Sequence, residues 1–320
     1  MRKFVVTTSM ILLSLLPGTA LGERYAIVVG VNDCPDFRLP DGSKPRPLRG
    51  AENDANAVAE VLRTRFGFDP KHIYLLKGRE ATREKLEARF EQLARLAKQN
   101  DVIVFHFSGH GTQFDDRRPF DEPDRLDEAL CMYDATADGK HLVVDDELGV
   151  WLDDIPARHV TVILDCCHAG TGIKDPDDEI RPRFLPIESA AKPASAGKDV
   201  WTELRGSTKA IGRKMTAFFA CRPEQQAYER RFFTAKAPLR AGQFSYYLLE
   251  GLRDARADAN RDGTLSTREL LDFTTGRLQK TFNSKRKEPA ARQEPLLETD
   301  SGDEPVFGLK LPKSEDTGRK

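Results

Sequence analysis

Four short runs of consecutive apolar residues place the strongest constraint on how this chain folds. They lie at residues 24–31, 73–76, 102–107 and 161–164. A strand with one wet face alternates apolar and polar residues, whereas these runs are apolar on both faces. That pattern is typical of parallel strands covered by helices on both sides. The sequence therefore predicts an α/β fold with a mostly parallel central sheet flanked by helices on both faces.

Helical patterns between these runs support the same fold class. Residues 51–66 carry apolar side chains at helical spacing, and residues 83–100 carry one apolar stripe behind Thr82, a candidate N-cap. A further strand is expected within residues 214–223 and a further helix at residues 242–252. The alternation of strand and helix is the pattern of an α/β sheet.

The first 22 residues differ from the rest of the chain. Arg2 and Lys3 precede an apolar run that ends at Leu16, and a pattern of small residues follows up to Gly22. This order is typical of a signal peptide. We therefore predict that residues 1–22 are removed and that the protein is exported, to the periplasm or outside the cell. An uncleaved membrane anchor is the alternative, but the run is short for a bilayer span.

Charge and cysteine content limit the classes of partner. The chain has 320 residues, with 50 Lys and Arg against 51 Asp and Glu, for a net charge of −1. Nothing in this balance predicts binding to nucleic acid, or to a membrane once the signal peptide is gone. The five cysteines are odd in number, so at least one thiol has no intramolecular disulfide partner. In an exported protein, a free thiol suggests a functional role.

Reactive side chains directly follow two of the apolar runs. In VIVFHFSGHGTQ, residues 102–113, His110 lies between two glycines, and TVILDCCHAG, residues 161–170, contains two adjacent cysteines. Ligands of open α/β sheets bind beyond the carboxyl ends of the strands. A thiol and an imidazole at that edge would form a cysteine nucleophile with its proton-accepting partner. The alternative, an ordinary loop histidine, does not explain the flanking glycines and the cysteine motif.

Asp165 helps to decide which cysteine reacts. Side chains alternate along a strand, so Asp165 and Cys167 are expected on one side and Cys166 on the other. A carboxylate beside a thiol raises its pKa and makes it less reactive. Asp165 is therefore expected to serve another purpose, such as holding a cationic substrate side chain. This reasoning predicts Cys167 as the nucleophile, Cys166 as a small buried residue, and cleavage after Arg or Lys.

These two motifs resemble those of the metacaspases and bacterial caspase-like peptidases, peptidase family C14, over about residues 24–278. The resemblance implies a caspase-like fold in which the cysteine immediately before His168 is catalytic. It implies that Cys167 attacks the scissile carbonyl and that His110 protonates the leaving amine. It also implies that the backbone N–H groups of Gly111 and Cys167 hold the oxyanion.

The resemblance further implies a substrate pocket lined by Asp165 and Asp54, which would take a basic P1 residue of a protein or peptide substrate. Asp54 has a simpler alternative, a hydrogen bond near the start of its own helix. Two rival functions remain: a catalytically inactive caspase-fold binding or scaffold protein, and an EF-hand calcium-binding protein with structural thiols. Retention of both the thiol and the imidazole argues against the inactive scaffold.

Calcium is the cofactor that the resemblance implies, because many metacaspases are activated by calcium through a cluster of acids. The matching acids are Asp127, Asp145 and Asp146, with Asp175 as a further candidate after the catalytic loop. Adjacent carboxylates suit a hard cation. The alternative is a solvated acidic loop, or Asp145 capping the helix that follows.

A second calcium motif is independent of the first. Residues 258–269, DANRDGTLSTRE, match the EF-hand loop pattern at every defined position. The expected oxygen donors are Asp258, Asn260, Asp262, the backbone carbonyl of Thr264, and Glu269. An ordinary turn between two helices is the alternative. We expect Ca²⁺ as the cofactor and no organic cofactor.

The domain organisation follows from these features. Residues 23–282 are expected to form one caspase-like peptidase domain, and residues 283–320 a polar C-terminal tail with a short strand near Val306. Within the domain, residues 175–215 are rich in proline and charge and read as a long exposed loop. Its basic residues are Arg181, Arg183, Lys192, Lys198, Arg205, Lys209, Arg213 and Lys214. The chain is predicted to cut itself after one of them; a solvated loop that is never cleaved is the alternative.

Overall fold

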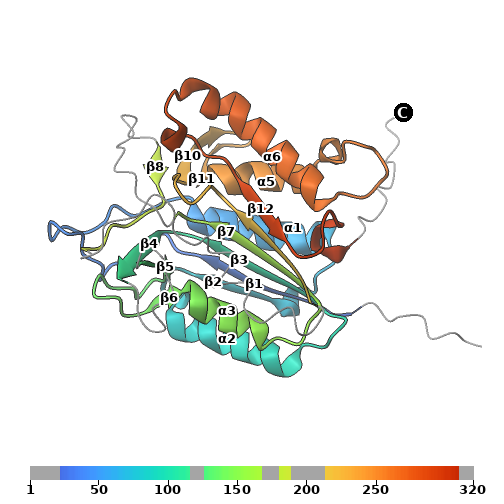
Figure 1. Cartoon of the computed structure of the whole chain (residues 1–320), viewed down its shortest axis with the longest axis horizontal. Helices are drawn as coiled ribbons and strands as arrows, with labels where there is room; N and C mark the ends of the chain where they lie inside the picture. Colours follow the sequence, from blue (N-terminus) through green and yellow to red (C-terminus); the bar gives the residue numbers. More distant parts are fainter. Residues whose placement is uncertain (1–21, 116–125, 168–179, 189–212, 310–320) are drawn as a thin grey trace, which may run out of the picture.

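The computed structural model describes residues 22–115, 126–167, 180–188 and 213–309. Its centre is a six-stranded sheet in the order β12-β9-β7-β3-β1-β2 (Figure 1). Its strands are β1 (Arg24–Gly30), β2 (Ile73–Lys77), β3 (Val102–Ser108), β7 (His159–Asp165), β9 (Lys214–Phe219) and β12 (Leu296–Thr299). All neighbours are parallel except β12, which is antiparallel to β9. The predicted α/β class with a mostly parallel sheet is confirmed.

Helices cover both faces of this sheet (Figure 1). One face packs against α1 (Ala51–Arg65), α5 (Gln243–Arg253) and α6 (Thr267–Thr281). The other packs against α2 (Arg83–Leu96) and α3 (Asp145–Asp153). The predicted N-cap of α2 is confirmed, because the Thr82 side chain accepts a hydrogen bond from the backbone N–H of Lys85. Burial on both faces explains why the parallel strands are apolar at consecutive positions.

Two three-stranded sheets lie beyond the central one. The first contains β4 (Gly111–Asp115), β5 (Leu126–Cys131) and β6 (Leu142–Val144), all antiparallel. The second contains β8 (Arg181–Pro182), β10 (Tyr228–Phe233) and β11 (Pro238–Gly242), also antiparallel. Short 3-10 turns occur at Pro70–His72, Gly78–Glu80, Ala255–Ala257, Asn283–Lys285, Pro289–Ala291 and Val306–Gly308. None of the six strands in these two small sheets was predicted from the sequence.

The structure corrects two expected boundaries. The stretch expected to be an exposed loop, 175–215, contains the buried residues Arg183 and Leu185, because they dock against other strands. The segment expected to be a tail, 283–320, contributes β12 to the central sheet, whereas the strand expected near Val306 is a 3-10 turn. The docked segments contain few apolar residues, so their burial depends on pairing that hydropathy does not reveal.

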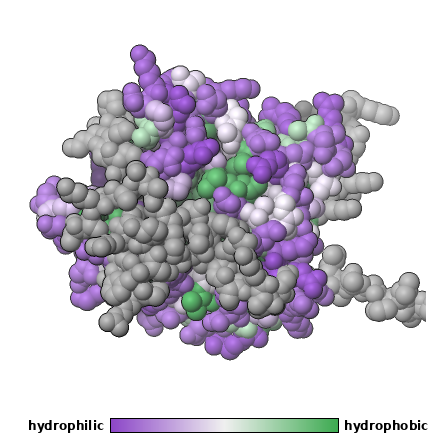
Figure 2. Space-filling view, viewed as in Figure 1, coloured by the Kyte–Doolittle hydropathy of each residue, from purple (hydrophilic) through white to green (hydrophobic). Residues whose placement is uncertain are grey.

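The described surface is mainly hydrophilic on the face shown in Figure 2. Large apolar side chains that are exposed within the described ranges are Leu75, Leu96, Val150 and Phe233. Residues 1–21 of the predicted signal peptide lie outside the described part of the chain. Among the helices that are described, none has the length and apolar character needed to cross a bilayer.

Candidate active site

The ends of two neighbouring parallel strands bring the reactive residues together. β3 and β7 pair in register up to Ser108 opposite Asp165. Beyond that pair, the N–H of Gly109 donates to the carbonyl of Asp165 at 3.3 Å. The chain then continues to His110 on one strand and to Cys167 on the other. The thiol and the imidazole therefore lie at the same edge of the sheet, where the sequence predicted them.

The two cysteines of the double motif point to opposite faces of the sheet. Cys167 belongs to the apolar cluster beneath α1 and α5, whereas Cys166 belongs to the cluster beneath α2 and α3. Asp165 faces the same side as Cys167, because the N–H of Ser245 in α5 donates to its Oδ2 at 3.0 Å. The predicted alternation of side chains is thus confirmed. None of the five cysteines forms a disulfide.

Burial keeps both reactive groups neutral. The side chains of Cys167 and His110 are almost fully buried. Burial raises the pKa of the Cys167 thiol to about 12. Burial, reinforced by the charge of Arg183, lowers the pKa of His110 to about 3. Neither ring nitrogen of His110 hydrogen-bonds to any described residue. The site therefore holds a thiol and an imidazole rather than a thiolate and an imidazolium.

Two backbone N–H groups converge on one carbonyl oxygen. The N–H of Gly111 donates to the carbonyl of Arg183 at 2.9 Å, and the N–H of Cys167 donates to the same oxygen at 3.3 Å. These are the two N–H groups that the family resemblance predicted would hold an oxyanion. The carbonyl of Arg183, a residue of the chain itself, therefore accepts from both of these N–H groups.

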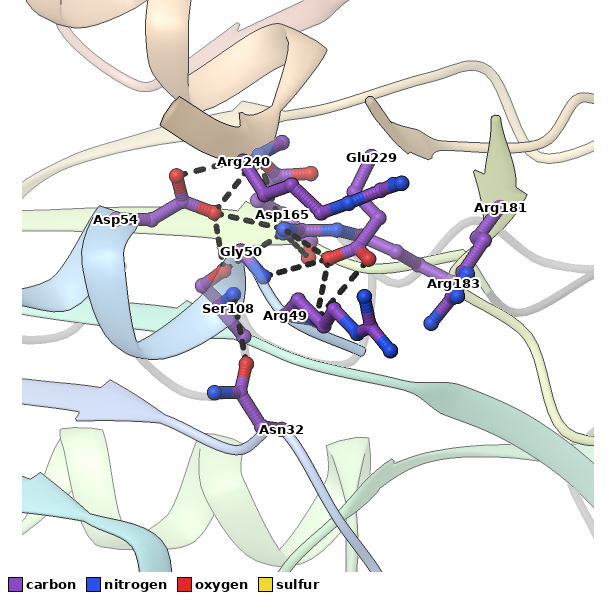
Figure 3. A network of polar contacts seen from close by, with 12 residues as sticks. Asn32, Arg49, Gly50, Asp54, Ser108, Asp165, Arg181, Arg183, Glu229 and Arg240 are labelled. Atoms are coloured by element: carbon purple, nitrogen blue, oxygen red, sulfur yellow. Dashed lines mark hydrogen bonds and ion pairs between the residues drawn. The ribbon is translucent and has the colours of Figure 1, made fainter. Parts of the chain in front are cut away.

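The side chain of the same residue fills an acidic pocket (Figure 3). Arg183 is fully buried. Its Nη2 lies 2.7 Å from Asp54 Oδ2, and its Nη1 lies 3.2 Å from Asp165 Oδ2. Nη1 also donates to Ser108 Oγ at 2.6 Å, and Glu229 Oε2 lies 4.0 Å from Nη2. Asp54 and Asp165, which were expected from the sequence to line a pocket for a basic side chain, thus both contact a guanidinium.

Backbone donors fix the acids of the pocket. Gly242 N–H donates to Asp54 Oδ2 at 3.0 Å, and Ser108 Oγ donates to the same oxygen at 2.8 Å. Burial raises the pKa of Asp54 to about 7, with Asp165 adding to the rise and Arg183 opposing it. Burial also opposes the charge of Arg183, but the carboxylates around it outweigh burial and raise its pKa above the ordinary value. The pocket therefore favours a permanently charged guanidinium.

Three pocket residues were missed from the sequence: Ser108, Glu229 and Gly242. Ser108 directly precedes the glycine before His110, so its position could have suggested a role. Gly242 has an ordinary φ of −61°, so its backbone does not require glycine. A Cβ there would lie 2.1 Å from Asp165 Oδ2 and 2.8 Å from Arg183 Cζ. Glycine is therefore needed to leave room for the Asp165 carboxylate and for the guanidinium beside it.

The acids expected to bind calcium beside the active site lie in two elements. Asp127 is buried in β5, and Asp145 and Asp146 form the first turn of α3. Carboxylates in a first turn are favourable to the helix dipole, which was the alternative role for Asp145. Asp175 lies outside the described residues. Within the described ranges, no three or more His, Cys, Asp or Glu side chains are placed to hold a metal ion.

The loop of residues 258–269 turns as an EF-hand loop does but does not gather its carboxylates. Gly263 has a φ of +81°, and its N–H donates to Asp258 Oδ2 at 2.9 Å. Glu269 Oε1 accepts from Asn260 N–H at 3.1 Å, and its Oε2 accepts from Ser266 N–H at 3.0 Å in the capping box of α6. The Thr264 N–H donates to Asp262 Oδ1 at 2.8 Å. The candidate ligands thus hydrogen-bond to the loop's own N–H groups, and within the described residues no three of their carboxylates are placed to hold one metal ion.

A buried thiol and an imidazole beyond adjacent parallel strands, with two N–H groups on one peptide carbonyl, define a cysteine-peptidase type of site. A family model described as "Caspase domain" matches residues 23–305. The chain therefore belongs to the caspase-domain peptidase family.

Individual relatives agree with this family. The chain is 27% identical to Metacaspase-3 of Arabidopsis thaliana over 312 residues, which are 94% of this chain and 78% of that one. It is 30% identical to Metacaspase III c of Phaeodactylum tricornutum over 163 residues, 49% of this chain. The chain thus spans 46% of the Phaeodactylum protein. Protein GSU0716 of Geobacter sulfurreducens superposes with a TM-score of 0.57 at 24% identity, covering 91% of this chain and 98% of that one, and so shares the fold.

Proposed function

We propose that the protein is a cysteine endopeptidase that cuts peptide bonds after Arg or Lys. One observation carries this proposal. Arg183 of the chain itself places its guanidinium between Asp54 and Asp165, and its carbonyl at the N–H groups of Gly111 and Cys167. Arg183 thus fills the acidic pocket with its side chain and the carbonyl site with its backbone at the same time.

The residues at the carbonyl site have defined roles in the proposed reaction. Cys167 Sγ attacks the scissile carbonyl carbon, and the resulting oxyanion is held by the N–H groups of Gly111 and Cys167. The thiol proton passes by way of His110 to the leaving amine as the C–N bond breaks, and a thioester remains. Water then hydrolyses the thioester, which restores the thiol and releases a carboxylate.

The pocket explains the proposed preference for basic residues. An acidic substrate side chain would add a further carboxylate beside Asp54 and Asp165, and like charges in a buried site repel strongly. A guanidinium contacts both carboxylates through different nitrogens, as Arg183 does. The ammonium group of Lys is a single point charge and cannot form this planar fork. The proposal therefore includes faster cleavage after Arg than after Lys.

Calcium dependence and export are further parts of this proposal. The EF-hand pattern at residues 258–269 and the tight turn at Gly263 support a calcium site, for which the carboxylates would have to move closer together than they are in this structure. A second calcium site at the acids of β5 and α3 is proposed from the family resemblance alone. The composition of residues 1–22 supports export. Calcium is plentiful outside the cytoplasm, so an exported protein would meet enough of it to fill such a site. Self-cleavage after a basic residue within residues 175–215 is also proposed.

Hydrolysis of short fluorogenic peptides tests the proposal. Peptides ending in Arg, Lys or Asp are compared, with and without calcium, for the wild type and for Cys167→Ala and His110→Ala. Cys166→Ala is the matched control, because it removes the neighbouring thiol on the opposite face. We expect activity on Arg and Lys only, lost in both active-site variants and retained in the control. Absence of hydrolysis under all conditions would favour an inactive scaffold.

A further inference from the structure

We propose that residues Arg181–Leu185 are bound as the enzyme's own substrate, that the bond it cuts is Arg183–Phe184, and that β4 recognises the residue two positions after the cut. This inference rests on the proposed function. It adds the cleavage position, the segment that closes the pocket, and a subsite on the far side of the scissile bond.

The residues before the bond are held as an added β-strand. β8, Arg181–Pro182, pairs antiparallel with β10, with Pro182 opposite Tyr228. The N–H of Arg183 donates to the carbonyl of Ala227 at 2.9 Å, and Arg181 Nη1 donates to the carbonyl of Pro47 at 2.6 Å. Addition of an extended segment to a sheet edge is a common way in which proteins bind peptides. Residues 181–183 therefore lie along the edge of β10 in the way that a bound peptide would.

The position of the scissile bond follows from the carbonyl contacts. The carbonyl that receives both N–H groups belongs to Arg183, so the peptide bond next to it joins Arg183 to Phe184. Hydrolysis there breaks one C–N bond and consumes one water. The proton of Cys167 moves through His110 to the nitrogen of Phe184, a thioester to Arg183 forms, and water then converts it to the Arg183 carboxylate.

The residues after the bond are also held. The N–H of Leu185 donates to the carbonyl of Gly111 at 2.9 Å, and Thr112 Oγ1 donates to the carbonyl of Leu185 at 2.6 Å. The Leu185 side chain is buried in the apolar cluster on the α2 and α3 side of the sheet. β4 thus hydrogen-bonds to both the N–H and the carbonyl of Leu185, and the apolar cluster beside it accommodates an apolar side chain. This predicts substrates with an apolar residue at the second position after the cut.

The docked segment also explains latency. While Arg183 fills the pocket, no other basic side chain can enter it, and Cys167 stays buried. Cleavage separates the two halves of the segment, so that each half is held only by its own contacts. The uncut protein is therefore expected to be inactive on added substrates until the Arg183–Phe184 bond is broken.

Mass spectrometry of the protein during incubation tests the cleavage position. The wild type, with and without calcium, is expected to yield one new C-terminus at Arg183 and one new N-terminus at Phe184. Cys167→Ala should stay intact, and Arg183→Ala should not be cut at this bond. Lys198→Ala is the matched control in the same segment and should be cut normally. A rate independent of protein concentration would show that the chain cuts itself.

The outcomes separate this inference from the proposed function. Cleavage at a different basic residue, or an intact chain in a protein that hydrolyses Arg peptides, would overturn the inference and leave the function standing. Absence of hydrolysis of every peptide would overturn the function first.

A second measurement tests the subsite on β4. An internally quenched peptide with the sequence of residues 181–187, RPRFLPI, is compared with one in which Asp replaces the residue equivalent to Leu185. We expect at least tenfold faster cleavage of the Leu peptide. Thr112→Val should lower the ratio of activity on the Leu peptide to activity on a reporter that ends at Arg. Equal cleavage rates for the two peptides would refute the proposed subsite on β4.

Discussion

The acids of the pocket give the most specific prediction, because their distances to the guanidinium differ. Asp54→Asn replaces a carboxylate that lies 2.7 Å from Arg183 Nη2. Removing one charge of a buried, hydrogen-bonded pair costs about 3 kcal/mol. At about 1.4 kcal/mol for each factor of ten, kcat/KM for a substrate with P1 Arg should fall by roughly 10²-fold.

Glu229→Gln is the matched variant. Glu229 lies 4.0 Å from the guanidinium, and its oxygens accept from the N–H groups of Arg49 and Gly50. Because it does not hydrogen-bond to the guanidinium, we expect about half the free-energy loss, roughly a tenfold fall in kcat/KM. The ranking of the two variants is therefore fixed by the structure.

The pH dependence of the activity gives a second test of the role of Asp54. The pKa of Asp54 is about 7, and a basic side chain requires the ionised form. That value holds with a guanidinium in the pocket, so for the wild type kcat on Arg peptides, which reports the substrate-bound enzyme, should fall as the pH drops through about 7, and Asp54→Asn should lose that part of the profile. Steady-state kinetics from pH 5 to pH 9 measure both effects. An Asp54→Asn variant within threefold of the wild type, or a larger loss in Glu229→Gln, would refute the reasoning.

Three further predictions concern the pocket wall, acid stability and calcium. Gly242→Ala places a Cβ 2.1 Å from Asp165 Oδ2 and 2.8 Å from the position of the Arg183 Cζ. It should lower kcat/KM on Arg peptides by more than roughly 10-fold through KM, whereas the control Gly276→Ala, which meets nothing within 4 Å, should not. Burial lowers the pKa of His106 to about 3, so its neutral form stabilises the fold fully above pH 6.5 and progressively less as the pH falls towards 3. Between pH 6 and pH 4, urea unfolding of the wild type should lose about 1.4 kcal/mol per pH unit more than that of His106→Gln, and parallel losses would contradict this. Isothermal titration should show calcium binding that Asp258→Ala weakens at least tenfold; equal binding by the variant would remove the EF-hand site.

The sequence predicted the parts of the fold that depend on local hydropathy. The consecutive apolar residues of β1, β3 and β7 predicted buried parallel strands. Because reactive side chains follow β3 and β7 directly, their meeting at one edge could also be predicted. The small sheets could not, since strands such as β6 and β8 have three and two residues and carry no readable period.

The content of the pocket depended on tertiary pairing. Asp54 was expected there only through the family resemblance, and Glu229 and Gly242 lie far along the chain. Arg183 was one of eight basic residues in a segment expected to be exposed. It is buried because carboxylates from α1, β7 and β10 surround its guanidinium, and no local pattern records that arrangement.

The central claim is that Cys167 is the nucleophile of a site that accepts a basic side chain. A peptide ketone that carries Arg and alkylates thiols covalently tests both parts at once, when its position is mapped by tandem mass spectrometry on the active protein. We predict a single adduct on Cys167, with no adduct on Cys166, and no labelling by the same reagent carrying Asp. An adduct on Cys166, or equal labelling by the Asp reagent, would contradict the account.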